Sequence, residues 1–393
     1  MKRIAIPLLL SLSLLLSGCQ NTDTGSNGGD SASTGAESVA VIDTAALFSD
    51  RDLDGSYDES AAVHIQLEGE TAVCDSDAVS IDGSRITLLD EGTYLVSGAL
   101  TDGQIVVDAG DTDKVQIVLA SASLTCADSA AIYSKSADKV FLTLAEGTEN
   151  TLTNGGSYTA IDKNNIDSVV FSKTDLTLNG SGSLTIDAQA GHGVVSKDEL
   201  TINGGTFTVD SVDDCLHSGG ALAVTGGTFT LSSGDDAIHS DDAVTIRAGE
   251  FSIPYCYEGV EGLSVTVEGE AFDVTAHDDG FNAAGGADSS DFGGMDEPFA
   301  ASEDSFITVN GGTITVVSDG DCLDSNGDLT VNGGTLDLTC NGNGNTALDC
   351  SGSYTNNGGS VTTNDGSETN SGGRSGNRLE EEREPLPSGR PKA

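Results

Sequence analysis

The sequence predicts an all-β protein that folds as a parallel β-helix with coils of about 22 residues. The first observation is a fixed period between residues 200 and 345, where Gly-Gly corners recur. The second is that apolar residues stand two and four positions after each corner, as in short strands with one buried face. The third is a composition rich in Thr, Val, Gly and Asn, which favours strands and turns over a helical solenoid. The corners are anchored by Gly205, Gly227, Gly249, Glu270, Gly312 and Gly334.

An acidic column accompanies the apolar columns, nine positions after each anchor. Stacked coils would bring its members about 4.8 Å apart on the outside of the coil, and like charges in register destabilise a sheet. A divalent cation would relieve the repulsion, and carboxylate oxygens suit calcium. The alternative is an acidic face that water and salt alone solvate. The column consists of Asp214, Asp236, Glu258, Asp279 and Asp321, and Asn343 ends it.

Three members of this column follow another acidic residue directly, which gives adjacent carboxylate pairs on three coils. Ca²⁺ is therefore the expected cofactor, because such pairs can supply several oxygen ligands from one corner. The expected ligands are Asp213, Asp214, Asp235, Asp236, Glu258, Asp278, Asp279 and Asp321.

The N-terminus has the features of an exported bacterial lipoprotein. Lys2 and Arg3 precede an apolar stretch at residues 4–16 that is too short for a permanent membrane helix. It ends in Leu-Ser-Gly-Cys, which resembles a lipobox with Cys19 as the lipidated residue. We therefore expect residues 1–19 to be a signal peptide and the protein to be extracellular, lipid-anchored to the bacterial cell membrane. The alternative is an ordinary signal peptide that happens to end in Cys.

The rest of the chain divides by composition. Residues 20–45 are polar and Gly/Ser-rich, typical of a flexible linker, and residues 46–362 are expected to form one β-helix domain. Residues 283–305 interrupt the repeat as a loop insertion, and residues 363–393 are expected to be a disordered tail. The acidic residues of segment 50–55 have calcium-loop spacing, but Ala61 stands where a bidentate Glu would be needed. This segment is interpreted as a polar turn in the N-terminal cap.

The net charge and the cysteine content limit the classes of partner, metal and disulfide that the chain can have. With 63 acidic and 16 basic residues the formal charge is −47, which excludes nucleic acid and anionic membrane surfaces as partners. Seven cysteines remain after Cys19, with no Cys-x-x-Cys pair and no His at zinc-ligand spacing, so a zinc site is not expected. Cys340 and Cys350 are the best candidates for a disulfide, and the odd count leaves at least one free thiol.

Several further motifs carry a family resemblance. They are Thr-Tyr-Leu-Val-Ser-Gly at 93–98, Gly-Gln-Ile-Val-Val at 103–107, Ala-Ala-Ile-Tyr at 130–133, Asn-Thr-Leu-Thr at 150–153 and Gly-His-Gly-Val-Val-Ser-Lys at 191–197. Together with the Asp-Asp-rich Asn-Gly-Gly repeats, over about residues 45–360, the chain is similar to a family of secreted bacterial carbohydrate-binding proteins.

The resemblance has several implications. Proteins of that family fold as a right-handed parallel β-helix similar to family 9 pectate lyases, bind calcium through the repeated acidic pairs, and associate with acidic pectin and cellulose. Carried onto this chain, it points to Asp213, Asp214, Asp235 and Asp236 as ligands, and to Asp278 and Asp279 next. Two coils depart from the pattern, because Tyr257 precedes Glu258 and Gly320 precedes Asp321.

The functional expectation is a monomeric binder of cell-wall polysaccharide, in which calcium bridges sugar carboxylates and the acidic ladder. Tyr257, His217, His239 and Arg247 are the candidate sugar contacts. One alternative is a calcium-dependent polyuronate lyase, which needs a base such as Arg247 or Lys197 beside the metal. The other is an adhesin or wall spacer stabilised by calcium. A base is not expected beside the acidic pairs, so binding without catalysis is favoured.

Overall fold

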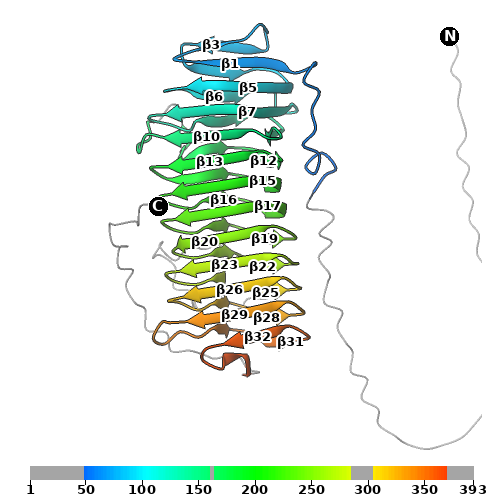
Figure 1. The fold of residues 1–393 in the computed structure, drawn as a ribbon, viewed down its shortest axis with the longest axis vertical. Helices are drawn as coiled ribbons and strands as arrows, with labels where there is room; N and C mark the ends of the chain where they lie inside the picture. Colours follow the sequence, from blue (N-terminus) through cyan, green and yellow to red (C-terminus); the bar gives the residue numbers. More distant parts are fainter. Residues whose placement is uncertain (1–47, 160–162, 285–303, 370–393) are drawn as a thin grey trace, which may run out of the picture. The chain divides into compact units, whose positions relative to one another are not determined.

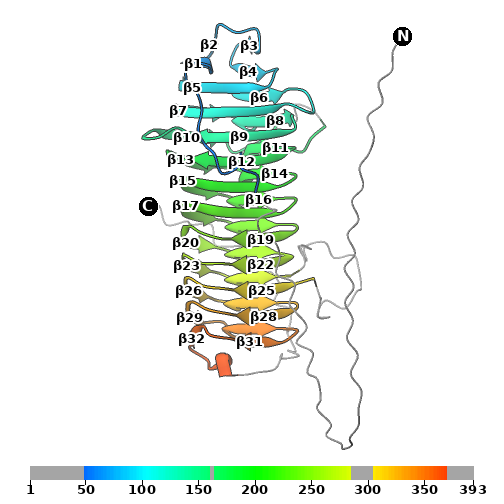
Figure 2. The same cartoon turned by 90° about the vertical axis from the view of Figure 1, so that its right-hand side faces the viewer.

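The computed structural model describes residues 48–159, 163–284 and 304–369, which form stacked coils of β-strand (Figure 1). Apart from one short 3₁₀ helix (Ser367–Thr369), these residues form strands and turns, and the coils follow one another in chain order (Figure 2). The predicted parallel β-helix is confirmed. No helix among the described residues is long and apolar enough to cross a membrane. The predicted signal peptide with Cys19, the linker and the centre of the loop insertion lie outside the described residues.

Two sheets run along the stack, and each coil contributes strands to both. Sheet B consists of β3 (Val79–Asp82), β4 (Arg85–Leu88), β6 (Gln104–Asp108), β8 (Ile132–Ser136), β11 (Ser168–Ser172), β14 (His192–Ser196), β16 (Leu216–Ser218), β18 (Ile238–Ser240), β21 (Val260–Gly262), β24 (Phe281–Ala283), β27 (Leu323–Ser325) and β30 (Leu348–Cys350).

Sheet A is the larger one, because most coils place two strands in it. It consists of β1 (Val63–Gly69), β2 (Ala72–Val73), β5 (Gly92–Leu100), β7 (Lys114–Cys126), β9 (Lys139–Leu144), β10 (Glu149–Asn154), β12 (Asp175–Gly180), β13 (Ser183–Ala188), β15 (Leu200–Ser211), β17 (Leu222–Ser233), β19 (Ala243–Ile246), β20 (Glu250–Cys256), β22 (Ser264–Val267), β23 (Ala271–Ala276), β25 (Phe306–Val309), β26 (Thr313–Ser318), β28 (Asp328–Val331), β29 (Thr335–Cys340), β31 (Tyr354–Asn356) and β32 (Ser360–Thr363).

The predicted period sets the pairing register. Phe207 pairs with Phe229, Phe229 with Phe251, and Phe251 with Phe272 in parallel strands. Phe272 then pairs with Ile314, which confirms that the long sequence step is an insertion between two otherwise regular coils. Among the described strands, antiparallel pairing occurs only in β1–β2 and β3–β4, at the N-terminal end of the stack.

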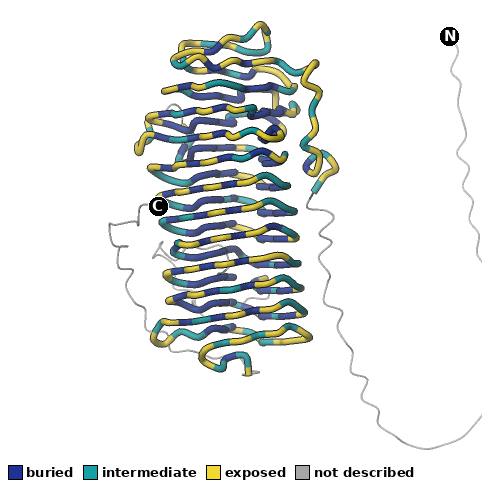
Figure 3. Tube along the Cα trace, in the orientation of Figure 1, coloured by how far each residue is buried: buried dark blue, intermediate teal, exposed yellow. Residues whose placement is uncertain are grey.

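The core is made of the apolar columns that the repeat predicts. The rings of Phe207, Phe229, Phe251 and Phe272 stack on one another with centroids 5.2, 4.5 and 4.4 Å apart, and all four are buried. The alternation of buried and exposed residues along each strand is visible in Figure 3. The prediction that the apolar residues two positions after each corner are buried is therefore confirmed, and these rings are unavailable as platforms for a sugar.

The last coil departs from the predicted register. Leu323 pairs with Leu348, 25 residues later, so the chain inserts three residues relative to a 22-residue step. Thr346 therefore continues the acidic column in place of Asn343, which lies in a turn. The first residues of the predicted tail, 363–369, include the end of β32 and the 3₁₀ helix, and the rest of the predicted tail, 370–393, lies outside the described residues.

Residues 49–55 do not cap the stack, as the sequence suggested, but lie against the side of sheet A. Arg51 donates to Gln116 on β7 (2.8 Å), and the buried Asp52 pairs with Lys139 on β9 (2.7 Å) and accepts from Thr177 on β12 (2.6 Å). Asn203 on β15 donates to the Leu53 carbonyl. Because Lys139 neutralises Asp52, this segment is a strap that joins four coils and not a calcium loop.

The seven described cysteines are free thiols, and the expected Cys340–Cys350 disulfide is wrong. Cys340 ends β29 in sheet A, whereas Cys350 ends β30 in sheet B, so the nine residues between them carry the chain from one sheet to the other. Both are buried as small apolar side chains, as are Cys215 and Cys322.

Candidate functional site

The outer face of sheet B is apolar in the N-terminal coils and polar in the later ones. Each strand carries one residue that lies outside the main core, and these residues pair in register from Tyr133 through Phe171 and Val195 to His217. The first three are buried in a small apolar cluster against which Tyr158 packs. From His217 onward the positions are polar. We call these polar positions the outer row: His217, His239, Glu261, Asn282, Asp324 and Asp349.

The acidic column lies at the corner that leads into each strand of sheet B. Its register follows from backbone hydrogen bonds between successive coils: Cys215 N–H donates to Asp236 O, Ala237 N–H to Glu258 O, Gly259 N–H to Asp279 O and Gly280 N–H to Asp321 O. The residue after each column member is small because the corner closes tightly there. At Gly280, for instance, an added Cβ would come within 2.4 Å of a Val316 methyl group.

The expectation that this column stands in solvent is wrong. Asp214, Asp236, Glu258, Asp279 and Asp321 are only 4, 5, 8, 1 and 2 % exposed. A buried carboxylate is costly unless hydrogen bonds or opposite charge compensate it. The groups that surround each carboxylate must therefore provide this compensation.

Backbone amides of the next coil provide part of that compensation. Asp214 Oδ1 accepts from the Asp236 N–H (3.0 Å), and Asp279 Oδ1 accepts from the Asp321 N–H (2.7 Å). Asp321 Oδ1 in turn accepts from the Thr346 N–H. The side chain at this position thus links one coil to the next in three pairs of adjacent coils, which explains why short acidic side chains recur there.

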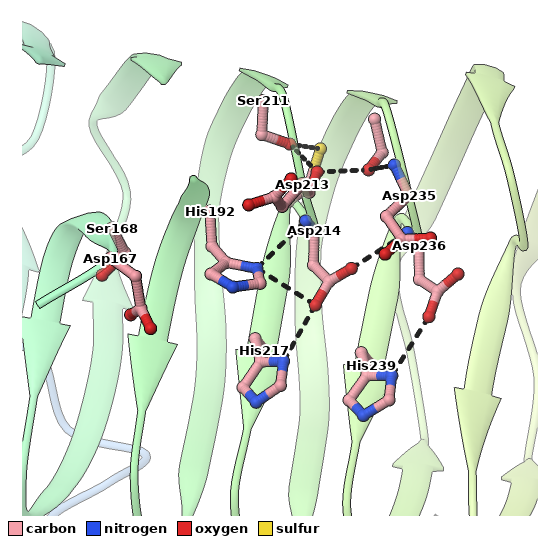
Figure 4. A network of polar contacts seen from close by, with 12 residues as sticks. Asp167, Ser168, His192, Ser211, Asp213, Asp214, His217, Asp235, Asp236 and His239 are labelled. Carbon is pink, nitrogen blue, oxygen red and sulfur yellow. Dashed lines mark hydrogen bonds and ion pairs between the residues drawn. The ribbon is translucent and has the colours of Figure 1, made fainter. Parts of the chain in front are cut away.

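Histidines compensate the N-terminal half of the column (Figure 4). Asp214 Oδ2 lies 3.1 Å from His192 Nδ1 and 2.8 Å from His217 Nδ1. His239 Nδ1 lies 3.1 Å from Asp236 Oδ2 and 2.8 Å from Glu261 Oε2. The rings of His217 and His239 stack with centroids 4.7 Å apart. His217 and His239, which the sequence suggested as sugar contacts, thus lie directly beside the acidic column.

The pKa values set Asp214 apart from its neighbours in the column, because burial raises the carboxyl pKa of Asp236 and Glu258 well above the usual value. Burial alone would raise the pKa of Asp214, but the neighbouring imidazoles of His192 and His217 hold it below the ordinary range. Burial alone would lower the pKa of His239, but its bonds to Asp236 and Glu261 raise it to about 12. At Asp279, burial and then the charges of Asp324 and Glu258 raise the carboxyl pKa well above its usual value.

The C-terminal half is a carboxylate cluster built from three elements. Oxygens of Asp321, Asp324 and Asp349 lie within 4.8 Å of one another, and the charge of Asp279 acts on the same corner. The donor set is oxygen only, which suits Ca²⁺. At Asp214 both oxygens already accept hydrogen bonds, so the C-terminal cluster fits calcium better than the pairs that sequence reasoning ranked first.

Sequence reasoning missed Asp324 and Asp349, although a signal was present. Each short strand of sheet B carries one polar residue between two buried ones, as in Leu323-Asp324-Ser325 and Leu348-Asp349-Cys350. This position alternates with the core and should face outward. A comparison of that single position across the repeats would have revealed the outer row.

The remaining predicted residues fall in two places. Asp213, Asp235, Tyr257 and Asp278 form a second column beside the acidic one, because Tyr257 N–H donates to Asp235 O (2.7 Å) and Asp278 N–H to Tyr257 O (2.8 Å). Arg247 is not brought to this face. It follows β19, at the bend between β19 and β20, where its guanidinium lies 6.0 Å from the centre of the Phe48 ring.

The comparisons with known proteins agree with a carbohydrate-binding family. A family profile described as "Carbohydrate-binding domain-containing protein" matches residues 82–344 and, in a second alignment, 235–377. A protein of the same description from Acetivibrio thermocellus is 36% identical over 135 residues, which are 34% of this chain and 47% of that protein. The aligned part thus spans about half of that relative.

A solved structure, a polysaccharide lyase-like protein from C. thermocellum in a gadolinium derivative, aligns with 77% of this chain and 94% of its own. Its TM-score is 0.45 and its sequence identity 24%. Since the profile covers more than half of the sequence, the chain belongs to the family of carbohydrate-binding domain-containing proteins.

Proposed function

We propose that this protein binds an acidic cell-wall polysaccharide of the pectin type on the outer face of sheet B, with Ca²⁺ as the bridging ion and without cleaving the chain. One observation carries the proposal: a row of polar residues and a column of buried carboxylates lie side by side on one face of a carbohydrate-binding family member. A polyuronate would otherwise be repelled by a chain of formal charge −47.

Calcium supplies the attraction that the protein surface lacks. Its preferred six to eight oxygen ligands exceed what three carboxylates provide, so carboxylates and hydroxyls of a sugar can complete the coordination. Asp321, Asp324 and Asp349 are the primary ligands in this proposal, and Asp279 is close enough to feel the charges of Asp324 and Asp321. Asp278 and Glu258 border the same corner, since both contribute to the raised pKa of Asp279.

Binding without catalysis is supported by the positions of the basic residues. Proton abstraction next to a uronate carboxylate needs a base close to the metal. Between Lys197 and Arg374 the sequence contains only Arg247 as a basic residue, and Arg247 packs by Phe48 at a different corner. Lys197 lies at the end of β14 beside Asp167, with its Nζ 3.9 Å from that carboxylate, several coils before the carboxylate cluster.

A second part of the proposal concerns location. We propose that Cys19 carries the lipid that holds the protein outside the bacterial cell membrane, because the Leu-Ser-Gly-Cys stretch follows a basic and then an apolar segment. Cys19→Ala should release the protein from the membrane fraction, whereas Cys74→Ala should not. Retention of Cys19→Ala in the membrane fraction would refute the anchor and leave the binding proposal unaffected.

The binding proposal is tested by titrating oligogalacturonate into calcium-loaded and chelator-treated protein in a calorimeter, with cello-oligosaccharide in parallel. We expect heat from oligogalacturonate with calcium alone. The double variant Asp324→Asn/Asp349→Asn should lose this heat, and Asp337→Asn, an exposed Asp on sheet A, should keep it. Equal heat with and without calcium would contradict the metal bridge. No heat in either case would favour the spacer, and ultraviolet absorbance from unsaturated uronate would favour the lyase.

A further inference from the structure

Three of the five histidines of the chain lie on consecutive coils of sheet B. His192 begins β14, His217 is the middle residue of β16, and His239 is the middle residue of β18. The centroids of neighbouring rings are 5.1 and 4.7 Å apart. Zinc was not expected from the sequence, because no two histidines stand at a local ligand spacing. The solenoid overturns that reasoning, since it brings residues 22 or 25 positions apart onto adjacent strands.

Two of these imidazoles converge on one carboxylate. Asp214 Oδ2 lies 3.1 Å from His192 Nδ1 and 2.8 Å from His217 Nδ1. One ligand atom from each of the three residues lies within 4.8 Å of the other two. Asp214 is buried and both histidines are half-buried. The strands and the corner that hold them are paired on both sides in the stack, so the donors are positioned by rigid elements.

The hydrogen bonds around His192 conflict. Its Nδ1 accepts the Asp214 backbone N–H at 3.1 Å and therefore carries no proton in that arrangement, yet the same nitrogen lies 3.1 Å from Asp214 Oδ2, which is also an acceptor. If the single lone pair of Nδ1 turns from this N–H toward Oδ2, a metal ion shared by Nδ1 and Oδ2 would supply the positive charge that is missing between the two acceptors. The surroundings also favour a cation, because Asp167 Oδ1 is buried without a hydrogen-bond partner among the described residues and the charges of Asp167 and Asp213 act on His192.

The donor set selects the metal. Two imidazole nitrogens and one carboxylate oxygen suit Zn²⁺ and other late first-row ions, whereas calcium prefers oxygen alone. Tetrahedral zinc with bonds of about 2.0–2.1 Å places its ligands about 3.3 Å apart, so the observed contacts need to open by only a few tenths of an ångström. Three protein ligands leave a fourth position for water or a ligand oxygen.

We propose that His192, Asp214 and His217 form a binding site for a late first-row divalent ion such as Zn²⁺, separate from the carboxylate cluster that takes calcium. The outer face of sheet B then carries two kinds of metal site, a nitrogen-containing one toward the N-terminal coils and an oxygen-only one toward the C-terminal coils. The ion would join two coils, and its open position would face the surface on which the polysaccharide lies.

The test uses the full chain stripped with chelator and then loaded with Co²⁺ or Zn²⁺ in a large excess of Ca²⁺. We expect one bound Co²⁺ with the visible spectrum of a low-coordinate site, displaced by Zn²⁺ and not by Ca²⁺. His192→Ala and His217→Ala should each weaken zinc binding by about 100-fold or more, beyond the 10–100-fold typical of outer-shell changes. His277→Ala, which removes an exposed histidine on the corner after β23, should bind zinc as wild type does.

Two further measurements keep the result interpretable. Far-ultraviolet circular dichroism and the calcium-induced rise in Tm report whether each variant folds. The X-ray absorption spectrum of zinc-loaded wild type should show scattering from two imidazoles, which requires no variant. Displacement of the metal by calcium, a spectrum without imidazole scattering, or equal loss in His277→Ala would overturn the zinc site, while calcium-dependent polysaccharide binding could still stand.

Discussion

Removing one charge from the carboxylate cluster should stabilise the calcium-free protein. Carboxylates of Asp321, Asp324 and Asp349 lie within 4.8 Å of one another. Two unit charges at that distance repel by about 3.5 kcal/mol at an effective dielectric constant of 20. Asp324 and Asp349 are half-buried, and proton uptake relieves part of the repulsion. We therefore expect Asp324→Asn to raise the free energy of unfolding in chelator by about 1–2 kcal/mol.

The same change should weaken the response to calcium. An ion present at about 100 times its Kd stabilises the folded state by about 2.7 kcal/mol, and a tenfold loss of affinity reduces this to about 1.4 kcal/mol. The unfolding entropy of some 300 ordered residues is about 0.6 kcal/mol per degree. The expected outcome is a Tm about 2–3 °C above wild type in chelator, together with a calcium-induced rise that falls from about 4 °C to about 2 °C.

Differential scanning calorimetry in chelator and in calcium measures both effects. Asp337→Asn is the matched control, because Asp337 is exposed on sheet A and pairs with Thr315 and Thr362 rather than with other carboxylates. It should change neither value. A Tm for Asp324→Asn at or below wild type in chelator, or an undiminished calcium response, would refute the reasoning that this corner is a strained calcium site.

Three other predictions follow from the core, the strap and the basic residues. Phe229→Ala should cost about 3–5 kcal/mol because the ring is buried between two stacked neighbours, whereas Thr230→Ala on the exposed side should cost little in the same urea titration. Burial would raise the pKa of Asp52, but hydrogen bonds from Lys139, Thr177 and Ser49 lower it to about 2. The stability gained, about 2 kcal/mol, should be complete above pH 4 and lost as the pH falls toward 2, and Asp52→Asn should remove this part of the pH dependence. Lys197→Ala should leave polysaccharide binding unchanged within twofold and the absorbance of unsaturated product at background in both proteins, so that activity abolished by the substitution would identify a lyase.

The repeated coil could be predicted because its signal is periodic. Gly-Gly corners and the Phe column recur at a constant spacing, so the register of Phe207, Phe229, Phe251 and Phe272 follows from counting. The register of the last coil could not be predicted by counting, because three inserted residues move Thr346 into the position assigned to Asn343. A single irregular turn near a chain end carries no periodic signal of its own.

The candidate site was predicted in part for a related reason. The acidic column could be predicted because it repeats in every coil. How deeply its carboxylates are buried depends on how sheets A and B meet, which the repeat does not specify. The pairing of Asp52 with Lys139 and Thr177 joins residues far apart in sequence and has no local signature. Asp324 and Asp349 were missed because each strand of sheet B contributes only one outward position, too few for an alternating pattern.

The most direct measurement is a crystal structure of the protein loaded with calcium, with anomalous data collected at a wavelength where calcium scatters. The account predicts an anomalous peak at about 2.3–2.6 Å from oxygens of Asp321, Asp324 and Asp349. It also predicts the loss of this peak in Asp324→Asn/Asp349→Asn crystals. A calcium-soaked structure with no ion at that corner, or with ions only at exposed carboxylates of sheet A, would contradict the account.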